Sequence, residues 1–79
     1  MNELLQHKYD VLASLYHSPC TLEELSKRDF CLRLPMWYIH DIIRRLEQDG
    51  YLKEGKNGVW ETYRRKSKKK LNELDYEVD

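Results

Sequence analysis

The densest group of chemically active side chains in the sequence is a basic strip in its C-terminal third. Residues 50–70 carry eight lysines and arginines against two glutamates, which gives the strip a net charge of +6. Ammonium and guanidinium groups gathered in this way bind phosphate oxygens. The basic members of the strip are Lys53, Lys56, Arg64, Arg65, Lys66, Lys68, Lys69 and Lys70. The strip predicts contact with a phosphate backbone, and a solvated charge run is the alternative interpretation.

The whole chain is electrically balanced, so the molecule is polarised rather than basic. Its 79 residues include 14 basic and 14 acidic side chains, for a formal net charge of +0. The strip is therefore offset by −2 over residues 1–49 and by −4 over residues 71–79. Binding to a polyanion depends on the face that is presented, so the local excess matters more than the sum.

Helical periodicity predicts two helices ahead of the strip, in the first third of the chain. Leucines and tyrosines recur at helical spacing over residues 3–17 and form one apolar stripe. Ser18-Pro19 ends this helix, and Thr21 with Glu24 three residues later is the sequence of a capping box. A short second helix is therefore predicted over about residues 22–28.

A third helix is predicted over residues 35–49. Pro35 suits the first helical position, because its missing N–H would have no partner there. Gly50 suits a left-handed residue just past the helix end. The apolar positions that would face the core are spaced i, i+3, i+4 and i+7, namely Ile39, Ile42, Ile43 and Leu46.

A β-hairpin is predicted over residues 51–64, with strands on either side of Asn57-Gly58. A two-residue loop would place Glu61 opposite Glu54, whereas a three-residue loop with a left-handed Gly58 would place it opposite Lys53. Charge pairing favours the second register. In either register the exposed tip of the hairpin carries Lys56 and Asn57.

A last helix is predicted over about residues 67–77, with Leu71, Leu74 and Val78 along one side. Three lysines in its first turn would oppose the helix dipole. Together with the helix over residues 3–17, this apolar side could join two copies of the chain in a homodimer.

Three helices followed by a hairpin give one mainly α domain over residues 1–79, in the order of a winged helix-turn-helix. The segment "IIRRLEQDGYL" is similar to the end of the recognition helix and the first wing strand of MarR- and PadR-like transcription regulators. The segment "YRRKSKKKLNEL" resembles the exit from the second wing strand of that family into a final helix. The resemblance covers about two thirds of the chain.

The resemblance implies a small transcriptional regulator that binds double-stranded DNA, with helix 35–49 in the major groove and the wing on phosphates or in the minor groove. From the residues themselves, burying the isoleucine side of this helix leaves Trp37, Asp41, Arg44 and Gln48 facing outward. Arginine suits phosphates or a guanine edge, and glutamine suits a base edge. The expected DNA contacts are Trp37, Tyr38, His40, Arg44, Arg45, Gln48, Lys56, Asn57, Arg64, Arg65, Lys66 and Lys68.

A protein-interaction module with the same fold is the alternative. Its contact surface would be formed by Trp37, Tyr38 and Trp60, with Met36 beside them, since exposed aromatic side chains are typical anchors of protein interfaces. Asp41 and the acidic residues 71–79 favour this alternative, whereas the basic strip opposes it.

Catalytic and metal-binding signatures are not found in the sequence. It lacks a phosphate-cradling glycine-rich loop and a nucleophile elbow, so we expect no enzymatic activity and no cofactor. His17, Cys20, Cys31 and His40 do not have the paired spacing of a zinc site. No apolar run approaches the roughly 18 residues of a membrane span, so we expect no membrane association. No signal peptide is evident, so we expect a cytoplasmic location, in which the cysteines are reduced.

Overall fold

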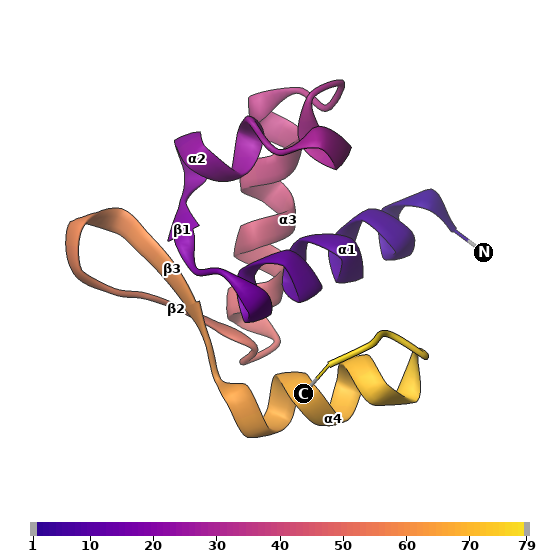
Figure 1. Cartoon of the computed structure of the whole chain (residues 1–79). Helices are drawn as coiled ribbons and strands as arrows, with labels where there is room; N and C mark the ends of the chain where they lie inside the picture. Colours follow the sequence, from indigo (N-terminus) through magenta and orange to yellow (C-terminus); the bar gives the residue numbers. More distant parts are fainter. Residues whose placement is uncertain (1, 79) are drawn as a thin grey trace.

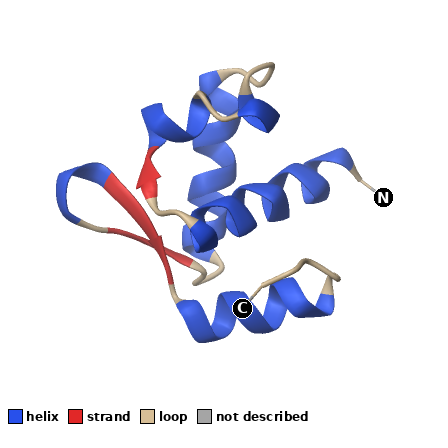
Figure 2. Ribbon diagram, in the orientation of Figure 1, coloured by secondary structure: helices blue, strands red, loops and turns tan. Residues whose placement is uncertain are grey.

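The computed structural model describes residues 2–78 and is mainly helical, with a small antiparallel sheet at one side of the helices (Figures 1 and 2). Short 3₁₀ turns lie at Asp29–Cys31 and Lys56–Gly58. In chain order the helices and strands are α1 (Glu3–His17), β1 (Cys20–Thr21), α2 (Leu22–Ser26), α3 (Met36–Gln48), β2 (Leu52–Glu54), β3 (Val59–Thr62) and α4 (Arg64–Glu73).

The first two helices begin where the sequence predicts. Helix α1 has the predicted bounds. Helix α2 begins with the predicted capping box at Thr21, but it ends at Ser26 rather than at residue 28. Arg28 leaves the helix with an extended backbone, and its guanidinium donates to the carbonyl oxygens of Ser14 and Ser18 at 3.0 and 2.8 Å. These two bonds tie the end of α2 to the end of α1.

We expect Thr21→Ala to lower the free energy of unfolding by about 1 kcal/mol, because Thr21 and Glu24 satisfy backbone N–H groups of each other. The hydrogen bonds from the backbone and side chain of Thr21 lower the pKa of Glu24. The stabilisation from these bonds to the Glu24 carboxylate is therefore fully present at pH values above the ordinary pKa of a glutamate. It is lost as the pH falls through the lowered pKa of Glu24 in the folded protein. Urea denaturation at neutral and acidic pH measures both effects. Thr21→Ser keeps the hydroxyl and should unfold like the parent, so an equal loss in both variants would contradict this account.

Helix α3 begins one residue later and ends one residue earlier than predicted, at Met36 and Gln48. Pro35 is the residue before the helix and not its first member; its backbone is extended, with ψ 148°. Gly50 is left-handed as predicted, with φ 83°. The N–H groups of Gly50 and Tyr51 bond back to the carbonyls of Glu47 and Leu46, both at 3.0 Å. This pair of bonds is a Schellman motif, which ends α3 and turns the chain into β2.

The β2–β3 hairpin has the register that charge pairing favours. Lys53 lies opposite Glu61, and the three-residue loop 56–58 has Asn57 and Gly58 in the left-handed region at φ 58° and 74°. Strand β1 was not predicted from the sequence; it pairs with β3 through Cys20 opposite Trp60 and makes the strand order β1-β3-β2. A two-residue strand is too short to show alternation of apolar and polar residues.

The predicted bounds of the last helix and of the second hairpin strand were wrong. Strand β3 ends at Thr62, and α4 begins at Arg64 rather than at residue 67, so Arg64 lies on the helix and not on the hairpin. The helix ends at Glu73 rather than at residue 77, because Asp75 is left-handed at φ 64° and the chain turns back. The N–H of Tyr76 then bonds to the carbonyl of Leu71 at 2.9 Å, which closes a second Schellman motif.

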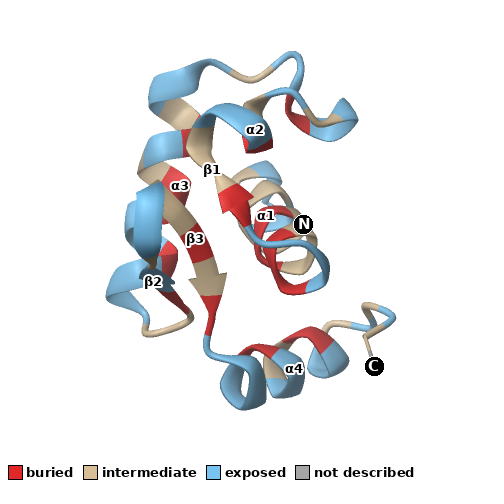
Figure 3. Ribbon diagram, turned by 60° about the vertical axis from the view of Figure 1, so that its left-hand side comes forward, coloured by how far each residue is buried: buried red, intermediate tan, exposed pale blue. Residues whose placement is uncertain are grey.

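The core lies where α1, α3 and the sheet meet, and α4 closes it from below in the view of Figure 1; Figure 3 shows the buried side of each element. Leu71 is fully buried within the chain, so it is not available to a second copy as the homodimer prediction requires. The buried apolar residues are Val11, Leu12, Leu15, Tyr16, Cys20, Leu25, Cys31, Ile39, Ile42, Ile43, Leu46, Leu52, Trp60 and Leu71.

Both cysteines are buried free thiols. Burial raises the pKa of Cys31 to about 11 and also raises the pKa of Cys20. The thiolate is the reactive form, so we expect the native protein at neutral pH to react slowly with iodoacetamide and the urea-unfolded protein to react fully. Mass spectrometry of timed samples measures the difference. Rapid labelling of both thiols in the native protein would show that the core is open around them.

Candidate nucleic-acid interface

One side of α3 is exposed and carries most of the predicted contacts of this helix. Burial of the isoleucine side leaves His40, Arg44 and Gln48 exposed, and Trp37 is 71% exposed at the start of the helix. Trp37, Arg44 and Gln48 follow one another at helical spacing, so their side chains share one side. The structure thus brings together four of the six contacts predicted on this helix.

The two arginines of α3 differ in their surroundings. Nε of Arg45 donates to Oδ2 of Asp41 at 2.9 Å, and this bond raises the pKa of Arg45. Arg44 makes no hydrogen bond or ion pair within the described part of the chain. Asp41, which favoured the protein-interaction alternative in the sequence, is thus paired with Arg45, and Arg44 is the cation that α3 offers to a partner.

Tyr38 faces α1 rather than the exposed side of α3. Its hydroxyl lies 2.9 Å from Nδ1 of His7, and the two rings meet edge to face with centroids 5.6 Å apart. The hydroxyl is thus occupied by a contact between helices. Its predicted role in DNA binding has no support from this position.

A groove of about 570 Å³ separates the exposed side of α3 from the hairpin. His40 and Arg44 line it from α3, and Asn57 and Gly58 line it from the hairpin tip. Its acidic lining residues come from α2, α3 and β2, namely Glu23, Glu47 and Glu54. The α3–hairpin groove is therefore a cleft whose lining combines hydrogen-bond donors with three carboxylates.

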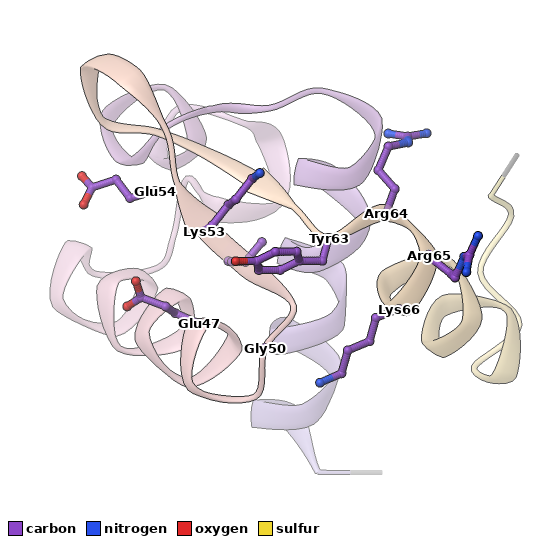
Figure 4. Close-up of a pocket in the computed structure, with 9 residues that line it drawn as sticks. Glu47, Gly50, Lys53, Glu54, Tyr63, Arg64, Arg65 and Lys66 are labelled. Carbon is purple, nitrogen blue, oxygen red and sulfur yellow. The ribbon is translucent and has the colours of Figure 1, made fainter.

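A second, wider groove of about 870 Å³ lies between the end of α3, the hairpin and the start of α4 (Figure 4). It shares Glu47 and Glu54 with the α3–hairpin groove, so the two adjoin along the hairpin. In Figure 4, Lys66 extends toward Gly50, whereas Arg65 points the other way. The basic lining residues of this groove are Lys53, Arg64, Arg65 and Lys66.

Half of the basic strip is occupied by contacts within the chain. Arg64 donates to the carbonyl of Tyr16 at 3.2 Å, and Lys66 donates to the carbonyl of Asp49. These carbonyls lie at the C-terminal ends of α1 and α3, where the helix dipole favours a cation. Four basic groups of the strip lie over tyrosine rings, with distances to the ring centroid of 5.4 Å for Lys53 over Tyr63, 4.2 Å for Arg64 over Tyr16, 4.9 Å for Lys66 over Tyr51 and 5.6 Å for Lys70 over Tyr9.

This arrangement divides the strip, which the sequence presented as one phosphate-binding surface, into two groups of basic residues. Arg64 and Lys66, which were expected to hold phosphates, attach α4 to the ends of α1 and α3. The sequence held a signal for this, because its six tyrosines provide rings on which cations stack. The other half of the strip makes no hydrogen bond, ion pair or ring contact within residues 2–78, and consists of Lys56, Arg65, Lys68 and Lys69.

The aromatic surface predicted for a protein partner is also changed. Trp60 is only 8% exposed and belongs to the core, so it cannot form part of a contact surface. Exposed apolar side chains occur instead within residues 30–37, between α2 and the first turn of α3. They are Phe30, Leu32, Met36 and Trp37, exposed by 37%, 63%, 45% and 71%.

Comparison with models of protein families, with curated proteins and with solved structures found no match to this chain. Among residues 2–78, no helix combines the length and the apolar composition that crossing a bilayer requires. The geometry of the exposed surface is therefore the basis on which a function can be argued.

Proposed function

We propose that this chain is a winged helix-turn-helix module that binds duplex DNA and acts as a small transcriptional regulator, with α3 in the major groove and the β2–β3 hairpin as the wing. The observation that carries this proposal is the α3–hairpin groove. His40 and Arg44 of α3 and Asn57 at the hairpin tip line the same cleft. A helix and a hairpin that share one cleft can contact a groove of the duplex and its neighbouring backbone together.

The exposed side of α3 has side chains suited to base edges. The major groove is roughly 12 Å wide and admits an α-helix. Arg44 can donate two bonds to guanine, and Gln48 can donate to and accept from adenine. Trp37 offers an apolar surface to a thymine methyl group. These three side chains lie along one side of α3 and are exposed to a partner.

The carboxylates of the groove limit where phosphates can lie. Glu23, Glu47 and Glu54 would repel a backbone placed deep in the α3–hairpin groove. Phosphates are favoured instead near the hairpin tip, where the exposed Lys56 makes no hydrogen bond, ion pair or ring contact within the described chain. We therefore expect binding that depends strongly on salt, because each neutralised phosphate adds about 0.9 to the slope of log K against log salt.

Selection from a random duplex pool at low salt tests the proposal. Enrichment of one sequence, followed by a steep salt dependence for the enriched duplex, is the expected result. The exposed Trp37 and the buried Trp60 make tryptophan fluorescence a direct signal, with Trp37→Phe as the control for which residue reports. The proposal fails if no duplex is retained at low salt.

A protein-interaction module is the second candidate, and the exposed apolar side chains within residues 30–37 favour it. Isolated exposed apolar side chains are ordinary, but four of them within eight residues, including a tryptophan that is 71% exposed, are typical of an interface anchor. This candidate predicts a partner whose binding is insensitive to salt and is lost in Trp37→Ala. Retention of that partner by Trp37→Ala, or duplex binding without any such partner, counts against it.

A further inference from the structure

Three free cations of the basic strip lie together on one side of α4. Arg65, Lys68 and Lys69 are spaced i, i+3 and i+4, so their side chains neighbour one another on the helix. Ser67 and Leu71, on the other side of the helix, are fully buried against the rest of the chain. The exposed Asn72, one further turn along, extends this side with an uncharged hydrogen-bonding group.

These three charges form no ion pair within the described chain. Like charges at this spacing repel one another, and cations in the first turns of a helix oppose its dipole. The neighbouring basic residues Arg64, Lys66 and Lys70 are stabilised by tyrosine rings, whereas Arg65, Lys68 and Lys69 make no such contact within residues 2–78. Such a surface is complementary to a partner with a regular series of negative charges.

The position of α4 indicates where that partner would run. The helix passes the C-terminal end of α3 and lies beneath α1 (Figure 1). Its first turn borders the wider groove beside the hairpin, and the guanidinium of Arg65 points away from Gly50 at the end of α3 (Figure 4). Arg65 therefore lies at the edge of the candidate interface. Lys68 and Lys69 follow it along α4, in the direction that leads away from α3.

The spacing of the cations suits a nucleic-acid backbone. Arg65 and Lys69 are separated by roughly 6 Å along the helix axis, at 1.5 Å per residue. Phosphates of one strand follow each other at roughly 3.4 Å along the duplex axis. The separation is close to two such steps, roughly 6.8 Å, so the two long side chains can reach phosphates of the same strand.

We infer that Arg65, Lys68, Lys69 and Asn72 form a second contact with duplex DNA, on the phosphate backbone that flanks the segment read by α3. This inference rests on the proposed function and adds a flanking site to it. Because the contact involves phosphates alone, it raises the affinity for every sequence equally and does not change base preference.

The test uses the selected duplex in a series that is extended stepwise on either side. The intact protein should bind more tightly as the duplex is lengthened on one side, until α4 is fully occupied. The triple variant Arg65→Gln, Lys68→Gln, Lys69→Gln should lose this gain, and its slope of log K against log salt should fall by roughly 2 to 3. Glutamine is a good helix former, so α4 should persist, and circular dichroism checks this directly.

Two adjacent lysines provide a matched control. Lys69→Gln removes a free cation, whereas Lys70→Gln removes one that lies over the ring of Tyr9. We expect only Lys69→Gln to lower the salt slope. If the triple variant and Lys69→Gln bind every duplex with the salt slope of the intact protein, the flanking contact is refuted while the proposed function stands. If the intact protein binds no duplex at all, the proposed function itself has failed.

Discussion

Leu46→Ala is expected to lower the free energy of unfolding by about 2–5 kcal/mol, because it removes a fully buried side chain and leaves a cavity. Leu46 lies on the buried side of α3, opposite the exposed Arg44 and Gln48. A domain of this size has a total stability of roughly 4–12 kcal/mol, so the loss would consume a large share of it. Urea denaturation followed by circular dichroism measures the change.

The matched control is another leucine outside the core. Leu32 is 63% exposed, and Leu32→Ala should change the free energy of unfolding by no more than about 0.5 kcal/mol. Similar losses in Leu46→Ala and Leu32→Ala would mean that α3 does not bury the side that the structure assigns to the core. The exposed side of α3 would then have to be reassigned as well.

Arg44→Ala is expected to weaken binding to the selected duplex by about 1–3 kcal/mol, which is roughly 5- to 150-fold in the dissociation constant. Arg44 is the cation of α3 that makes no hydrogen bond or ion pair in the described chain, and it lines the α3–hairpin groove. Losing a bidentate bond to a base should also relax the preference at one position of the site. Titration of the selected duplex and of duplexes substituted at each position measures both effects.

Arg45→Ala is the control for this prediction, since the neighbouring arginine is paired with Asp41 at 2.9 Å. Its removal exposes the charge of Asp41 and should weaken all sequences by the same small factor, without a change in base preference. If Arg45→Ala relaxes base preference and Arg44→Ala does not, the two arginines have been assigned the wrong roles.

Local signals account for the parts of the fold that could be predicted. Helix periodicity, the Thr21 capping box and the left-handed Gly50 depend on residues within a few positions of one another. The hairpin register also followed from a local choice, since one loop length pairs Lys53 with Glu61 and the other pairs two glutamates. Each of these features is present in the structure.

Contacts between distant residues explain what the sequence did not reveal. Strand β1 exists because Cys20 pairs with Trp60, forty residues away, and a two-residue strand has no pattern of its own. The early start of α4 has a similar origin, because Arg64 reaches Tyr16 and Lys66 reaches the end of α3. The sequence does not show these distant partners, so the helix was predicted to begin later, at about residue 67.

The kinds of residue in the candidate site could be predicted from the sequence. Which of them make contacts within the chain and which remain available to a partner could not. A lysine over a tyrosine ring and a lysine free in solvent have the same sequence signature. Only the fold shows that Lys66 and Lys70 lie over rings while Lys68 and Lys69 do not. The apolar residues were divided in the same way, since Trp60 is in the core and Trp37 is exposed.

The most direct test of the central claim is to follow the backbone amide resonances of the isotope-labelled protein while a short duplex is added at low salt. We predict that the largest shifts fall on the exposed residues of α3 and on the hairpin tip, at His40, Arg44, Gln48 and Asn57. Resonances that stay unmoved throughout the titration, or shifts confined to parts of the chain outside α3, the hairpin and α4, would contradict the claim that this surface binds duplex DNA.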